Sequence, residues 1–337
     1  MRITLFLSCL AFVVSAQAQT APKVVFTGDV FTYNWQQSPA FKANTKWIGA
    51  GLDSFGSTFQ ESTYVAAEFQ TNVINQHPDF VFIDTGSSDI AWQIDSTPLG
   101  AEWPDAANAI VQMVDMAQKA GIKVILGNVP MGNPSFSGLP DANSDYFNNW
   151  LQTYAQAANL PIVNLQYWLQ YGCSGLSPCG GALATNQPNS FDILIPTDAG
   201  YQFITQLAQT AIATYGLQIK SGYLSDVETI NAFNGVSPQN PPQVNSVGTG
   251  ARVQFTPVAQ WSDGVSRPML NSPYGGALGT WWSTNPGVMA VNQHGLATAY
   301  NAGTATIWFK SASGATFSPW AVTVSAVNPY VTYPPLY

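Results

Sequence analysis

The stretch that decides the fold is Lys23–Tyr33, which reads KVVFTGDVFTY. Its β-branched and aromatic run, Val24–Thr27, is typical of a buried strand, and Gly28 and Asp29 follow at the carboxyl end of that run. Further strands are predicted outward from it at Phe80–Asp84, Val124–Leu126 and Ile162–Asn164. Helical patterns separate these strands, and such alternation gives right-handed crossovers. We therefore expect a parallel sheet with helices on both faces and with ligand sites at the carboxyl ends of its strands.

Four helices are predicted from their caps and end signals. Pro104 stands at a first-turn position and Gly121 just past the last turn, two marks that together delimit a helix. Ser144 is expected to cap a second helix, and Thr197 or Asp198 a third. The predicted helices cover residues 62–75, 104–120 and 145–158, and a last one runs to about residue 215.

The pattern changes after Gly222. Residues 234–249 are rich in proline and asparagine without a helical period, which indicates an interdomain linker. Beyond them, short alternating runs predict an antiparallel β-sandwich, with strands at Val253–Phe255, Gly279–Trp282, Met289–Val291, Thr304–Phe309 and Trp320–Val324. The predicted order is a three-layer α/β/α domain over 19–233, the linker, an all-β sandwich over 250–326 and a tail over 327–337.

Composition favours a globular protein that binds a neutral ligand. Of 337 residues, 46% are hydrophobic and only 8% are charged, and the formal net charge is −8. Nucleic acid and anionic lipid are disfavoured partners, because binding them needs clustered lysine and arginine. No cofactor and no metal is expected, and the sequence does not indicate an oligomeric state.

The first eighteen residues are typical of a signal peptide. Arg2 supplies the positive region, an apolar run follows, and Ala16-Gln17-Ala18 forms a small-x-small cleavage site. The mature chain holds no apolar run of 18 residues, so membrane insertion is not expected. We expect secretion to the periplasm, the cell surface or the medium.

Two cysteines remain after removal of the signal peptide. Cys173 and Cys179 bracket a short loop in a chain that is expected to reach an oxidising compartment. A disulfide is the favoured state there, and two free thiols are the alternative.

Four blocks, in order, resemble those of SGNH/GDSL hydrolases. KVVFTGDVFTY is similar to the first block, normally Gly-Asp-Ser, and WIGAGLDSFGST at 47–58 is similar to the second. In the second block, either Ser54 or Gly56 holds the place of the glycine that supplies an oxyanion-hole amide. HPDFVFIDTGSSDI at 77–90 is similar to the third block, Gly-x-Asn-Asp, and FDILIPTDAGY at 191–201 to the last, Asp-x-x-His-Pro.

The resemblance implies that most of the catalytic groups are substituted. Family members use a serine nucleophile, a histidine base, an aspartate that orients the histidine, and donors for the oxyanion. Val30 stands at the serine position, Ile195 at the histidine position and Ser88 at the asparagine position, whereas Asp192 is retained. The oxyanion-hole-like positions are Ser54, Gly56, Gly86 and Ser88, and the scaffold residues near the site are Gly28, Asp29, Asp89 and Pro196.

No histidine is expected to replace the missing base. His77 precedes the strand Phe80–Asp84 and so belongs at the opposite end of the sheet, while His294 lies in the predicted sandwich. Several aspartates fall near the strand ends, and such groups can serve glycoside hydrolysis or bind calcium. We favour the alternative that Asp29 and Asp89 hydrogen-bond loop amides.

The C-terminal stretch resembles a bacterial Ig-like group 2 domain. The similarity rests on WSDG at 261–264, WWSTNPGVMAVNQHGLATA at 281–299 and NAGTATIWF at 301–309. The resemblance implies a spacer or adhesive unit in an extracellular protein.

The predicted function is that of a secreted, catalytically degenerate SGNH-hydrolase-like protein whose former cleft holds a polysaccharide or an acylated glycan. Trp35 and Trp92, beside the blocks, are candidates for stacking on sugar rings, although tryptophans more often fill cores. One alternative is an active GDSL-type esterase or carbohydrate deacetylase with a displaced nucleophile. Another is a noncatalytic cell-surface protein with an adhesive or structural role.

Overall fold

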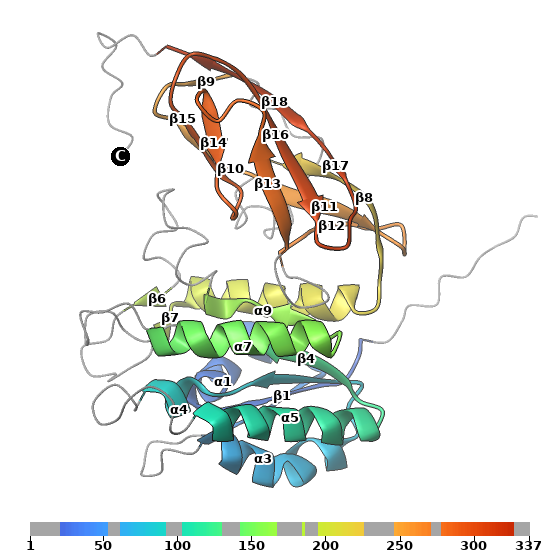
Figure 1. Cartoon of the computed structure of the whole chain (residues 1–337). Coiled ribbons are helices and arrows are strands. Elements are labelled where there is room, and N and C mark those ends of the chain that lie inside the picture. The colour runs from blue at the N-terminus through green and yellow to red at the C-terminus, as the bar shows by residue number, and fades with distance from the viewer. Residues whose placement is uncertain are drawn as a thin grey trace, which may run out of the picture.

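A computed structural model describes residues 21–52, 61–91, 103–129, 142–166, 184–185, 195–225, 246–270 and 278–326. The N-terminal part is an α/β unit, and a β-rich region follows it along the chain (Figure 1). Helix α9 is the last helix before that region begins.

The centre of the α/β unit is a five-stranded sheet with the order β2-β1-β3-β4-β5. Its strands, in that order, are Trp47–Gly51, Val24–Gly28, Phe80–Asp84, Lys123–Gly127 and Ile162–Val163. Every neighbouring pair is parallel. The predicted parallel sheet is therefore confirmed, with the edge strand β2 added to the strands that the sequence indicated.

Helices cover both faces of this sheet. They are α1 (Val30–Gln37), α2 (Pro39–Lys42), α3 (Glu61–Asn72), α4 (Ser87–Ala91), α5 (Trp103–Lys119), α7 (Ala142–Ala157) and α9 (Asp198–Thr214), with a 3₁₀ turn η1 at Ile74–Gln76 and a short hairpin of β6 (Ala184–Thr185) and β7 (Ile195–Pro196). Helices α3, α5 and α7 lie on one face, and α1, α2 and α9 lie on the other. The three-layer α/β/α class predicted from the sequence is confirmed.

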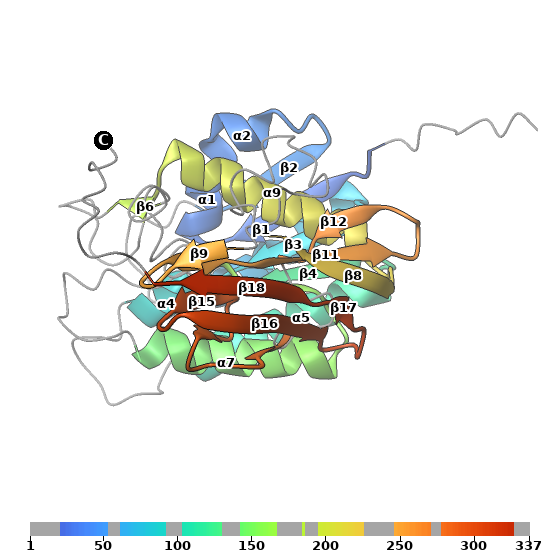
Figure 2. The ribbon, with the colours of Figure 1, turned by 90° about the horizontal axis from the view of Figure 1, so that it is seen from above.

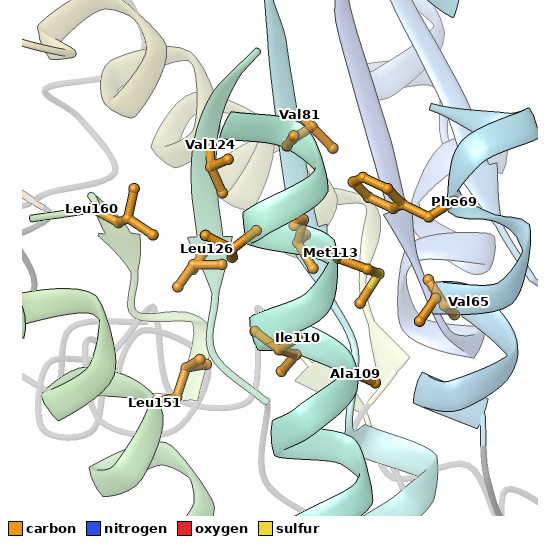
Figure 3. Close-up of a cluster of buried hydrophobic side chains, with 14 of the residues drawn as sticks. Val65, Phe69, Val81, Ala109, Ile110, Met113, Val124, Leu126, Leu151 and Leu160 are labelled. Atoms are coloured by element: carbon orange, nitrogen blue, oxygen red, sulfur yellow. The ribbon is translucent and has the colours of Figure 1, made fainter. Parts of the chain in front are cut away.

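Each face of the sheet has its own core because successive strand residues point to opposite sides. Figure 3 shows one core, in which Ile110 and Met113 of α5 meet Phe69 of α3 and the strand residues Val81 and Val124. The other core is aromatic and is built from Phe26, Phe82, Trp35, Phe41 and Phe203. Fully burying one such side chain stabilises the fold by about 1.5–3 kcal/mol.

The helix signals were accurate with one exception. Helix α5 ends before Gly121, which has a φ of +73°, and Thr197 caps α9 by accepting a hydrogen bond from the Gly200 amide at 3.2 Å. The prediction that Ser144 is a cap is wrong, because α7 begins at Ala142 and Ser144 is buried inside its first turn.

The β-rich region comprises three sheets with the orders β10-β15-β14, β12-β11-β8-β17 and β13-β16-β18-β9. Its strands are β8 (Ile219–Ser225), β9 (Ser246–Gly248), β10 (Arg252–Gln254), β11 (Thr256–Trp261), β12 (Ser266–Pro268), β13 (Gly279–Ser283), β14 (Met289–Val291), β15 (Leu296–Ala299), β16 (Gly303–Ser311), β17 (Phe317–Ser318) and β18 (Trp320–Ser325). Most pairs are antiparallel, as predicted, but β17 with β8 and β18 with β9 are parallel.

The β-sheets begin earlier in the chain than the sequence indicated. Strand β8, which falls inside the predicted first domain, pairs with β11 over Thr256–Trp261. Strand β9, which falls inside the predicted linker 234–249, pairs with β18. Strand β9 has three residues, and β8 (IKSGYLS) is rich in polar residues and glycine, so the pattern of each is weak and the partners in the sheet decide their place.

The β-rich region also packs against the α/β unit. Leu270, which follows β12, is 1% exposed and belongs to the core that contains Phe203 and Leu207 of α9. The Gln218 backbone amide, between α9 and β8, donates to Ser262 Oγ at 3.2 Å and holds the start of β8 against the turn after β11. Figures 1 and 2, two perpendicular views, both place β11 and β12 beside α9.

Within the described ranges, no helix has both the length and the apolar character needed to cross a membrane.

Candidate functional site

The candidate site begins at the carboxyl end of β1, where two backbones come close together. A Cβ atom on Gly28 would lie 1.7 Å from the carbonyl oxygen of Asp84 and 2.4 Å from Thr32 Oγ1. Only glycine fits there without displacing the end of β3. This contact explains why the first block ends its strand with glycine.

The carboxylate of Asp29 joins the first and third blocks. As the N-cap of α1, its Oδ1 accepts from the Phe31 amide at 3.2 Å. Its Oδ2 accepts from the amides of Gly86 at 3.1 Å and Ser88 at 3.3 Å. Asp29 is fully buried, so these charge-assisted bonds are the means by which the fold holds the turn after β3 against α1.

Val30 is the first residue of α1 and stands immediately after this cap. It is only partly buried, at the place where the resemblance puts the nucleophile. A valine side chain has neither a lone pair nor a transferable proton, so this position cannot attack an ester.

The third block forms a tight turn into the short helix α4. Gly86 has a φ of +114°, and a Cβ at that residue would lie 2.8 Å from the Phe147 ring. The Ser88 side chain is buried, in the position where the family carries an asparagine donor. Asp89 accepts from the Ser62 hydroxyl at 2.7 Å and from the Ser62 amide at 3.2 Å, which fixes the start of α3.

Asp84 brings a second buried carboxyl group to the same edge. Its Oδ2 lies 3.4 Å from the donor Thr32 Oγ1, while its Oδ1 is buried without a hydrogen-bond partner. Burial, reinforced by the negative charge of Asp29, raises the pKa of Asp84 well above its usual range. Asp84 therefore keeps its proton to a higher pH in the folded protein than in the unfolded chain.

The last block is described only in part. Ile195 and Pro196 form β7, which pairs with β6, and Pro196 is buried. Several predicted site residues lie outside the described residues: Asp192, Ser54, Gly56, Trp92, Cys173 and Cys179.

The prediction that Trp35 contacts a ligand is wrong. Its side chain is 0% exposed, and its indole N–H donates to Thr205 Oγ1 of α9 at 3.0 Å. Its ring packs edge-on against Phe26, with centroids 5.0 Å apart. Trp35 therefore belongs to the core beneath α1.

The histidines lie where the sequence placed them. His77 is exposed and precedes β3, at the end of the sheet opposite to Gly28. His294 lies in the β-rich region, and burial lowers its pKa. In the described ranges, no three histidine, cysteine, aspartate or glutamate side chains gather in a way that could hold a metal ion.

Sequence reasoning missed two polar arrangements around the site. The Gln36 side chain of α1 accepts from the Gly51 amide at 3.1 Å and thereby fixes the end of β2. Near the ends of β4 and β5, the side-chain amide of Asn148 donates to Gln166 Oε1 at 2.8 Å. The backbone N–H of Gln166 donates to Asn128 Oδ1 at 3.0 Å. Asn128 directly follows a buried strand, and this position was the available signal.

These features define a three-layer α/β protein whose candidate site lies at the carboxyl ends of β1 and β3. The model of the GDSL-like Lipase/Acylhydrolase family matches residues 26–203, and the chain belongs to that family.

Solved structures with similarity to the chain include a GDSL-like lipase from Bacteroides thetaiotaomicron VPI-5482. It is 28% identical, covers 57% of this chain and 87% of its own, and has a TM-score of 0.44. An acetylxylan esterase from Geobacillus stearothermophilus, in a catalytic-mutant form, is 18% identical, covers 56% of this chain and 93% of its own, and has a TM-score of 0.42. No curated protein matches the chain.

Proposed function

We propose that this chain is an exported member of the GDSL-like family that does not hydrolyse acyl esters and instead binds a neutral ligand, such as a polysaccharide or an acylated glycan. The observation that carries the proposal is Val30, which begins α1 directly after the Asp29 cap. The scaffold of the first block is retained around a residue that cannot act as a nucleophile.

Among the described residues, four hydroxyl groups at this edge of the sheet do not favour a displaced nucleophile. Thr32 and Ser62 are fully buried and donate to Asp84 and Asp89, respectively. Thr85 and Ser88 are also buried. A hydroxyl enclosed in this way is out of reach of an ester carbonyl, because attack requires the reacting atoms to come within about 3–3.5 Å.

Export and the nature of the second region are part of the proposal. The N-terminal residues with a cleavage signature support export, and the low charge supports a neutral ligand. The bacterial Ig-like assignment rests on the WSDG and WWSTNPG motifs, together with the β-sheets observed over 219–325.

Turnover of p-nitrophenyl acetate by the purified mature protein tests the loss of catalysis. We expect no hydrolysis above the buffer background, because removal of triad members costs on the order of 10⁴ to 10⁶ in turnover. The double variant Val30→Ser, Ile195→His supplies the missing nucleophile and base and is the matched comparison. Substantial turnover by the unmodified protein, abolished by Ser54→Ala, would contradict the proposal.

A further inference from the structure

The outer face of one sheet in the β-rich region carries two tryptophans side by side. Trp282 of β13 and Trp308 of β16 are directly paired in the antiparallel register. Their ring planes differ by 6°, and their centroids are 5.8 Å apart. Trp282 is 40% exposed, which makes it one of the few large apolar side chains on the described surface.

These tryptophans occupy outward positions of their strands, where a polar residue is usual. The alternating residues Trp281, Ile307 and Phe309 point inward and are buried in the core of the region. Outward positions of a half-buried antiparallel sheet are normally polar. Trp308 is partly buried, and Trp282 is exposed. A cross-strand aromatic pair contributes only about 0.2–1 kcal/mol to stability, which is a modest gain for placing two indoles on an outward face.

The residues around the pair are hydroxyl-bearing or small, and nearly all are uncharged. The outward positions of β13, β16 and β18 are Thr280, Trp282, Thr304, Thr306, Trp308, Lys310, Ala321, Thr323 and Ser325. They include no carboxylate, and Lys310 is their one cation. We call this set of residues the tryptophan face.

We propose that the tryptophan face binds a neutral polysaccharide, with Trp282 and Trp308 packing against the apolar faces of its sugar rings. Aromatic side chains that supply apolar area, combined with a few hydrogen-bonding groups, are typical of ligand sites. The threonine hydroxyls can donate to and accept from sugar hydroxyls. A nearly uncharged face fits an uncharged ligand, since neither partner has to desolvate an unpaired charge.

This inference deepens the proposed function and depends on it only for the class of ligand. It moves the expected ligand contact from the family site around Val30 to the β-rich region. The two sites lie on different parts of the chain: Val30 belongs to α1 of the α/β unit, and the tryptophan face belongs to β13, β16 and β18 of the β-rich region. Variants can therefore separate them.

Native affinity electrophoresis of the full mature chain tests the proposal, with gels that contain barley β-glucan, xylan, acetylated xylan or galactomannan. We expect at least one polymer to retard the unmodified protein. Trp282→Ala should weaken that retardation at least tenfold, and Trp282→Tyr should restore part of it because an aromatic face is kept. Tyr300→Ala, which removes an exposed aromatic residue outside the tryptophan face, should leave it unchanged.

Three outcomes would overturn the proposal, provided that circular dichroism shows each variant to be folded. The first is the absence of retardation by any of the four polymers. The second is retardation that Trp282→Ala leaves unchanged while Val30→Arg abolishes it, which would support binding around Val30 instead. The third is a concentration-dependent dimer, seen by sedimentation velocity and lost in Trp282→Ala, which would assign the face to a second copy of the chain.

Discussion

Asp84 is the residue at which the electrostatics of the site are most unusual. Its carboxyl group is fully buried beside Asp29, with one oxygen unpartnered, and its pKa is raised well above the usual range. Between the unfolded pKa, near 4, and the raised folded pKa, the folded protein binds more protons than the unfolded chain. This group therefore lowers the stability progressively as the pH rises through that window.

Replacing Asp84 with asparagine should remove this pH dependence. We expect Asp84→Asn to be more stable than the unmodified protein at neutral pH, and the gain should shrink toward zero below pH 4. Urea unfolding at pH 4, 5.5 and 7 measures the difference, with Asp79→Asn, a change at the opposite end of the sheet, as the control. A loss of stability that grows as the pH rises from 4 to 7 would show instead that the folded protein needs the carboxylate in its charged form.

For single residues, the sequence predicted which positions shape the turns at the strand ends, but it did not predict which side chains are buried. Gly28, Asp29 and Gly86 have the structural roles that their blocks imply, because strand ends and positive-φ turns restrict residue type locally. Trp35 was misjudged, since its burial depends on α9, which lies far away in sequence. A tryptophan's environment is a tertiary property, and single-sequence patterns do not contain it.

Helix α1 is the element that depends most on one side chain. Asp29 caps it and also accepts from two amides of the turn after β3. Loss of an ordinary cap costs about 1 kcal/mol. Hydrogen bonds to a buried charged group contribute about 1.5–3 kcal/mol each.

We expect Asp29→Ala to destabilise the protein by about 3 kcal/mol or more. Ser38→Ala is a matched control, because Ser38 caps α2 through a single bond from the Phe41 amide at 3.2 Å, and it should cost about 1 kcal/mol. Denaturant unfolding of both variants measures the difference. Equal losses in the two variants would mean that the bridge to the third block contributes little.

Elements with strong periodicity or clear end signals were predicted well, as in α5 and β3. Strand β2 was missed because Gly49 and Gly51 interrupt a five-residue run, and its place at the sheet edge is set by pairing with β1. Helix α1 was missed because its residues, VFTYNWQQ, are mostly weak helix formers that the cap and the core stabilise.

On the scale of the whole molecule, Leu270 links the β-rich region to the core around α9. Its truncation to alanine should cost about 2–5 kcal/mol, because it leaves a cavity in that core. Hydrogen exchange should consequently show lower amide protection in α9 for Leu270→Ala. Leu224→Ala removes an equivalent buried leucine from the core of the β-rich region and should leave α9 protected. Unchanged protection of α9 in both variants would contradict a shared core.

The junction between the two regions could not be predicted from the sequence. Composition placed the boundary in the proline-rich stretch 234–249, whereas β8 joins the β-sheets directly after α9. A strand of low hydrophobicity such as β8 acquires its place from its partner, and β11 lies more than thirty residues further along the chain.

The most direct test of the central claim, that the family site holds no activated nucleophile, is covalent labelling with a fluorophosphonate probe followed by intact-mass measurement. The probe modifies an activated serine wherever it lies, so the test also includes hydroxyls outside the described residues. We predict no mass increase in the unmodified mature protein after prolonged incubation with excess probe. A stoichiometric single adduct, mapped to one serine and lost when that serine is changed to alanine, would contradict the account.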